Sequence, residues 1–170
     1  MRAGCRRRID ALLWGLAAAG MKNLFDPLCV AELTGRLERL RPDSRRHWGK
    51  MTAGQAVAHC ALGVELALGD IRPPRMFLGR AIGGLIKYLA LRNDDPIRRN
   101  APTSPELVVT EDGDFGADRA RLTSLIGRFA DAGPAGCTTH PHSFFGRLTP
   151  EQWAVLMYKH VDHHLRQFGG

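Results

Sequence analysis

The stretch TPEQWAVLMYKHVDHHLRQFG, residues 149–169, predicts a helix and places three histidines on it. Thr149 is a typical N-cap residue, and Gln152 completes a capping box with it. Pro150 suits the first helical position because its missing N–H would have no partner within the helix. We therefore expect a last helix from Thr149 to about Phe168.

Two histidines of this helix, His160 and His164, are four residues apart. An α-helix turns by about 100° and rises about 1.5 Å per residue, so the two side chains differ in direction by about 40° and in height by about 6 Å. Their imidazole rings can therefore converge on one ion, whereas His163 points about 60° to one side of His160. The face of the pair also carries Trp153, Leu156 and Gln167, and the opposite face carries Tyr158, Asp162 and Leu165. We expect the pair to face the core.

An earlier helix offers a third imidazole. A capping box of Thr52 and Gln55 begins this helix, which runs to about Gly69. This segment is apolar nearly all round, which is typical of a central, buried helix. His59 lies in its middle, and a buried imidazole needs a hydrogen-bond partner or a metal. Three histidine ligands with one open position are typical of a catalytic metal site, since structural zinc sites are closed by four protein ligands.

The spacing of the histidines leaves two interpretations open. In the first, His59, His160 and His164 bind a divalent metal ion. In the second, the histidines of the last helix are partly solvated or hydrogen-bonded near its C-terminus, where the helix dipole favours imidazolium.

The rest of the chain predicts further helices and one long irregular segment. Asp26-Pro27 begins a helix that ends before Pro42, and a third helical stretch covers Phe77 to Leu91. Another helix is centred on Leu122, Leu125, Ile126 and Phe129 and ends at Gly133-Pro134. Residues 93–114 are rich in turn formers, and within them residues 107–109 predict a short strand. The pattern indicates an all-α bundle of four or five helices.

The composition excludes several classes of protein. The chain has 170 residues, of which 44% are hydrophobic and 24% charged, as in an ordinary globular domain. No apolar run approaches the ~18 residues of a membrane-spanning helix. The four cysteines are far apart and form no CxxC pair, which argues against a zinc ribbon and against a dense disulfide framework.

Residues 1–20 are interpreted as an N-terminal extension upstream of a start at Met21, and residues 21–170 as a single domain. The alternative for residues 1–20 is a leader that resembles a short secretory signal, because four arginines precede the apolar run LLWGLAAA. These residues hold four of the 24 basic and one of the 17 acidic residues, so the net charge of +7 falls to 20 − 16 = +4 without them.

Several short motifs within residues 21–170 are similar to those of a known family. These segments are WGKM at 48–51, AHC at 58–60, NAPT at 100–103, HSFFG at 142–146 and KHVDHHLRQFG at 159–169. On these segments the chain resembles an uncharacterised bacterial family within the DinB/YfiT-like superfamily of metal-binding four-helix bundles.

This resemblance implies a fold, a ligand set and a choice of chemistries. The fold is a DinB/YfiT-like four-helix bundle with a long irregular interior loop. In that superfamily one histidine of the second helix and two of an H-x-x-H-H-x-x-Q pattern in the last helix hold the metal, and these correspond to His59, His160 and His164. The implied cofactor is a divalent ion, most readily Zn²⁺ or Ni²⁺. The implied reactions are metal-dependent hydrolysis and the transfer of a low-molecular-weight thiol to an electrophile.

We therefore expect a cytoplasmic metal-binding protein that acts on a small molecule of unidentified structure. The alternative is a non-catalytic, stress-related or ligand-binding bundle. The run of arginines at 36–46 lacks the interleaved aromatic residues of a single-strand binder, so no nucleic-acid partner is expected. No membrane partner is expected either, and a homodimer is left open. His163 is the one candidate for a general base. His140 and His142 are interpreted as exposed loop residues, with the mouth of a site as the less favoured alternative, and a hydrogen-bond donor to a ligand is the less favoured alternative for His47.

Overall fold

The computed structural model describes residues 20–101 and 103–170, and the described chain is all-helical, as expected. Its five α-helices are α2 (Pro27–Arg39), α3 (Ala53–Leu68), α4 (Phe77–Leu91), α5 (Phe115–Ala132) and α6 (Pro150–Gln167). Two short 3₁₀ helices, η1 (Pro105–Leu107) and η2 (Pro134–Gly136), lie in the connections. The expected extension falls mostly on residues 1–19, which lie outside the described residues.

The helices begin where the local sequence predicts. Asp26, Thr52 and Thr149 accept backbone N–H bonds as N-cap residues, and both predicted capping boxes form, at Thr52 with Gln55 and at Thr149 with Gln152. α3 ends at Gly69, whose φ of 85° is the left-handed conformation that glycine adopts without strain. The predicted bounds of α3, α4 and α6, the start of α2 and the end of α5 are therefore confirmed to within one or two residues, while no start was predicted for α5.

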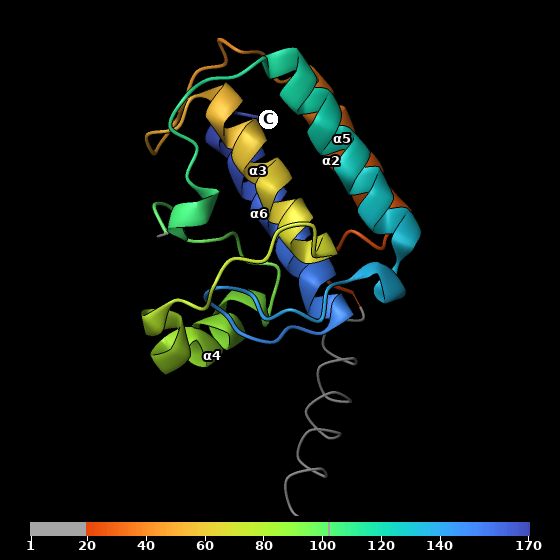
Figure 1. Cartoon of the computed structure of the whole chain (residues 1–170). Helices are drawn as coiled ribbons and strands as arrows, with labels where there is room; N and C mark the ends of the chain where they lie inside the picture. The colour runs from red at the N-terminus through yellow and green to blue at the C-terminus, as the bar shows by residue number, and fades with distance from the viewer. Residues whose placement is uncertain (1–19, 102) are drawn as a thin grey trace, which may run out of the picture.

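Four helices pack around one hydrophobic core, and α4 lies at one end of them (Figure 1). α3 contacts both α5 and α6, and α2 also contacts both of them. Most residues of α3 are buried, which confirms its predicted central position. The largest completely buried side chains include Trp153, Phe129, Leu24, Leu33 and Leu122.

The predicted strand at residues 107–109 is wrong. The chain instead forms η1, which ends at Leu107, and continues without regular structure. Pro105 at the first position favours the turn, and none of the described segments forms a strand with which residues 107–109 could pair. Outside η1, the described residues of the segment 93–114 are irregular. Residue 102 is not among the described residues.

Within the described ranges, no helix is both long and apolar enough to cross a membrane.

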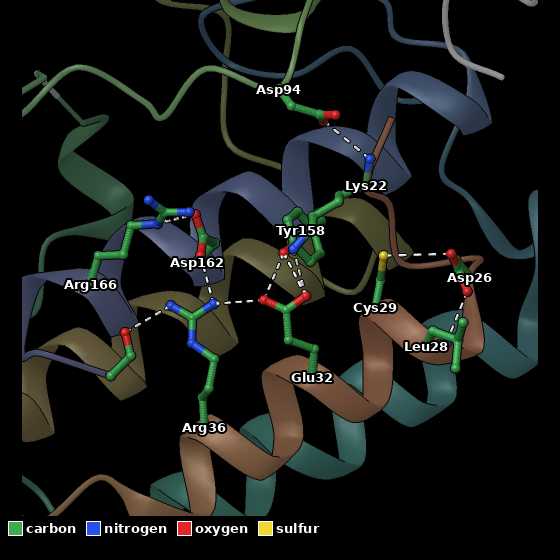
Figure 2. Close-up of polar contacts among 11 residues, drawn as sticks. Lys22, Asp26, Leu28, Cys29, Glu32, Arg36, Asp94, Tyr158, Asp162 and Arg166 are labelled. Carbon is green, nitrogen blue, oxygen red and sulfur yellow. Dashed lines mark hydrogen bonds and ion pairs between the residues drawn. The ribbon is translucent and has the colours of Figure 1, made fainter. Parts of the chain in front are cut away.

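A polar network joins α2 to the side of α6 that faces away from the histidine pair (Figure 2). Arg36 donates to Asp162 at 2.7 Å and to Glu32 at 3.2 Å, and Arg166 donates to the second oxygen of Asp162 at 2.7 Å. The Tyr158 hydroxyl donates to Glu32. Because the Asp162 carboxylate is buried, these bonds fix the rotation of α6, which in turn directs His160 and His164 to the other side.

Arg36→Met is expected to lower the free energy of unfolding by about 2–4 kcal/mol, because buried Asp162 then keeps only the half-exposed Arg166. Urea unfolding measures the loss. Arg39→Met, which alters an exposed arginine in the same helix, is the matched control and is expected to change it by less than ~0.5 kcal/mol. Equal losses in the two variants would contradict this role of Arg36.

Candidate metal centre

Three imidazoles from two helices converge at the centre of the molecule. His59 of α3 meets His160 and His164 of α6, and one nitrogen of each ring lies within 4.8 Å of the others. The ring centroids are 4.7, 5.0 and 5.1 Å apart, and the rings are close to perpendicular to one another. The structure therefore brings together the three histidines that the sequence singled out, in an arrangement that can hold a metal ion.

The ring of His59 is oriented by η1, the short 3₁₀ helix between α4 and α5. Its Nδ1 lies 2.7 Å from the carbonyl oxygen of Leu107, which can only accept a hydrogen bond. Nδ1 therefore carries the proton, and Nε2 keeps its lone pair. That nitrogen lies 2.9 Å from Nε2 of His160.

The ring of His164 is oriented in the same way by a side chain one turn further along α6. Its Nδ1 lies 2.9 Å from Oε1 of Gln167, and Nε2 of Gln167 donates to the carbonyl oxygen of Trp48 at 2.8 Å. The Trp48 contact fixes which end of the amide accepts, so Nδ1 of His164 is the donor and Nε2 is free to bind an ion. Such outer contacts are how proteins set the tautomer of ligating histidines.

Burial keeps the three imidazoles neutral. It lowers the pKa of His59 and His160, and it lowers the pKa of His164 to about 3. The neighbouring imidazoles also oppose protonation of His160 and His164. Metal binding requires neutral imidazole, so the site is ready to bind at neutral pH. The alternative of solvated imidazolium at the end of the helix is not what the structure shows.

Gly63 makes room for the ring of His160. A Cβ at this position of α3 would lie 2.7 Å from Nδ1 and 2.9 Å from Cε1 of that ring, closer than real Cβ contacts. Because the glycine lies one turn after His59, the two helices approach closely where the imidazoles meet.

A cavity of about 480 Å³ opens next to His59, His160 and His164, which we call the triad. The three histidines line it together with side chains of α4, α6 and the loops. Its apolar wall includes Met51, Leu66, Leu78, Ile82, Ile86, Ile97, Leu107, Phe144, Phe145, Leu156 and Met157. Lys50, Asn100, Thr103, Ser104 and Ser143 are among its polar residues. No aspartate, glutamate or cysteine of the described chain lines it.

Two further histidines line this cavity. His163 is buried, and its ring lies edge-on to Trp48 with the centroids 5.8 Å apart. Nδ1 of His142 accepts backbone N–H bonds from Phe144 and Phe145. The interpretation of His142 as an exposed loop residue is wrong, because its surroundings are built by a loop that approaches α4 only in the folded chain. His47 and His140 do not line the cavity.

Cys60 is buried and lies outside the cavity wall, and burial raises the pKa of its thiol. The thiol is therefore neither a metal ligand nor an available nucleophile in this structure.

A comparison with protein families places the chain among its relatives. The family model described as "Protein of unknown function (DUF1569)" matches residues 29–169. The chain belongs to the DUF1569 family. The match includes the whole triad, the Leu107 and Gln167 contacts and the cavity wall. Searches of the curated proteins and of the solved structures found no match.

Proposed function

We propose that this DUF1569 protein binds one divalent metal ion, zinc or nickel, at His59, His160 and His164. The convergence of three neutral imidazoles, two of them with the tautomer set by an oxygen acceptor, supports the proposal. The donor set is suitable because imidazole is a preferred ligand of both ions. The implied relation to DinB/YfiT-like bundles, which the comparisons do not test, leads to the same three residues.

We further propose that the protein transfers a low-molecular-weight thiol to an electrophile. When bound, the ion acts as a Lewis acid that lowers the pKa of a thiol or of water. No cysteine lines the described cavity, so the thiol would be a second substrate. No acidic residue of the described chain lines it either, so only His163 and His142 are left as general bases outside the three ligands, and burial lowers the pKa of both imidazoles. A free thiol has a pKa of about 8.5 and free water a pKa of about 15.7, and a bound ion lowers both, so the thiol is the easier of the two to deprotonate without a base. The cavity therefore favours thiol transfer over hydrolysis.

The cavity wall indicates what the electrophile looks like. Its volume of about 480 Å³ is within the ~300–1,000 Å³ typical of small-molecule sites. Its wall is mainly aliphatic and aromatic, while the imidazoles lie at one side of it. We infer a small substrate with an apolar body, whose reactive group points toward the triad.

The direct test is metal-dependent consumption of a thiol. The full chain, loaded with zinc or with nickel, is mixed with glutathione or cysteine and the apolar electrophile monochlorobimane. The thiol sulfur forms a C–S bond, chloride leaves and the thiol proton passes to solvent, and fluorescence follows this conjugation. We expect metal-dependent turnover that His160→Ala removes and that His47→Ala, a change at an exposed histidine outside the cavity, leaves intact. Metal binding without turnover of any thiol would contradict thiol transfer and support the non-catalytic alternative.

Gly63→Ala is expected to weaken metal binding by roughly 10–100-fold, because the new Cβ displaces the ring of His160. Gly127→Ala in α5 is the matched control, since a Cβ there meets nothing within 4 Å. It is expected to leave metal affinity unchanged and to raise stability by up to ~1 kcal/mol through helix propensity. Competition with a chromogenic chelator measures the affinity. Unchanged affinity in Gly63→Ala would show that His160 is not a ligand.

A further inference from the structure

The exposed side of α4 is apolar, and its packed side is built from small residues. Phe77 is 89% exposed, Leu85 61% and Tyr88 57%. Apart from Ile86, which lies about 40° beyond them, the exposed apolar residues of α4 fall within an arc of about 140° at 100° per residue. They are Phe77, Leu78, Ala81, Ile82, Leu85, Tyr88 and Leu89, which we call the α4 face.

Specific contacts hold α4 in this orientation. Gly79 and Gly83 are buried against the backbone of Phe144, where a Cβ would collide with its carbonyl group. At the other end, the buried ammonium of Lys159 donates to the carbonyl oxygens of Ala90 at 2.5 Å and Asn93 at 2.9 Å. The glycines and Lys159 fix the helix with its apolar side outward.

The segment around the α4 face is basic. Residues 71–93 contain Arg72, Arg75, Arg80, Lys87 and Arg92 and no acidic residue. The aspartates that flank this segment are Asp70, which pairs with Arg128, and Asp94 and Asp95 beyond the end of α4. Arg75 and Lys87 donate to backbone carbonyl groups of the molecule. Arg80 and Arg92 are exposed, and neither takes part in an ion pair of the described chain. The partner of this face should therefore be apolar and bordered by negative charge.

A second copy of the chain meets these requirements poorly. Two α4 faces in contact would bring ten basic residues together, with no acidic residue from either segment. A helix of 15 residues is about 22 Å long and about 10 Å wide, so each face offers roughly 220 Å². Stable interfaces bury about 1,200–2,000 Å² in total.

We propose that α4 docks the protein on the surface of an anionic membrane. Apolar side chains that enter the boundary of the acyl chains, bordered by arginines that meet acidic headgroups, are the features of an interfacial helix. At about 22 Å, α4 is shorter than the ~30 Å hydrocarbon core, so it lies on the membrane and does not span it. The sequence led us to expect no membrane partner because it contains no membrane-spanning segment. That reason does not apply to a helix that lies on the membrane surface.

The α4 face is continuous with the cavity. Leu78 and Ile82 belong to both, and Ile86 extends the cavity wall along the same helix. Docking through α4 therefore places an apolar edge of the cavity next to the lipid.

Sedimentation with lipid vesicles tests the proposal on the full chain. The vesicles are phosphatidylcholine alone or phosphatidylcholine with phosphatidylserine. The test variant is Leu85→Glu/Leu89→Glu on the α4 face, and Leu28→Glu is the matched control because Leu28 of α2 is 80% exposed. All three proteins keep the arginines of residues 2–8, so any binding through those arginines is common to them.

We expect the wild type and Leu28→Glu to bind vesicles that contain phosphatidylserine, less strongly as salt is raised. The α4 variant is expected to bind at least tenfold more weakly, with its circular dichroism spectrum and metal content unchanged. Equal binding by the α4 variant and the wild type, or no binding by the wild type, would overturn the proposal. A dimer that sedimentation velocity detects in the wild type and not in the α4 variant would also overturn it, in favour of a second copy. Because metal content is read separately, the outcome does not depend on the proposed function.

Discussion

Replacement of His59 by alanine is expected to lower the affinity for zinc by a factor on the order of 100–1,000. Structural zinc sites with four ligands gain about 10–16 kcal/mol, or about 2.5–4 kcal/mol per ligand, and each 1.4 kcal/mol is tenfold in affinity. His59 is the only ligand candidate of α3, so its loss leaves the pair of α6 alone. Competition with a chromogenic chelator measures the change.

His47→Ala is the control for this prediction. His47 is exposed and lies outside the cavity, so its loss removes one imidazole from the chain and none from the triad. Affinity that falls equally in both variants would mean that the metal binds elsewhere.

Trp153→Ala is expected to lower the free energy of unfolding by about 3–5 kcal/mol. The indole of this α6 residue is completely buried, and the centroids of its ring and the His142 ring are 5.6 Å apart. Truncation therefore opens a cavity between the core and the loop that lines the site. Urea unfolding at neutral pH measures the loss.

Trp153→Phe separates packing from hydrogen bonding at the same position. Nε1 of Trp153 is buried and has no hydrogen-bond partner in the described chain. Phenylalanine removes this unsatisfied donor and keeps most of the packing, so a loss of only about 1 kcal/mol or less is expected. Similar losses in the alanine and phenylalanine variants would contradict this view of the core.

The bounds of the helices could be predicted because local chemistry sets them. Thr149 and Thr52 cap their helices with their own side chains, and Pro27 and Pro150 occupy first turns whose N–H groups need no partner. The prediction of a strand at residues 107–109 was wrong because a β-prone segment forms a strand only where a second strand can pair with it. In the folded chain, the carbonyl of Leu107 contacts His59, a contact that only the tertiary structure creates.

The position of α4 could not be read from its hydrophobic pattern. An apolar stripe usually marks the packed side of a helix, but here glycines pack and the stripe is exposed. The close approach of Gly79 and Gly83 to the Phe144 backbone decides the orientation, and small residues contribute little to such a pattern.

The triad itself was accessible from the sequence. The spacing of His160 and His164 fixes their common direction, and His59 was a lone imidazole on an otherwise apolar helix. Gln167, which orients His164, was accessible too, because it lies on the same face of the last helix. The carbonyl groups of Leu107, in η1, and of Trp48, which holds the Gln167 amide, were not accessible, since they come from connections between helices. The inward position of His163 depends on its contact with Trp48, which is distant in sequence.

X-ray absorption spectroscopy of the zinc-loaded protein tests the metal centre most directly. We predict one zinc ion per chain, with a first shell of nitrogen and oxygen that includes three imidazoles and no sulfur. We also predict that His160→Ala/His164→Ala loses this spectrum. Sulfur in the first shell, or the same imidazole signal in the double variant, would contradict a metal site at His59, His160 and His164.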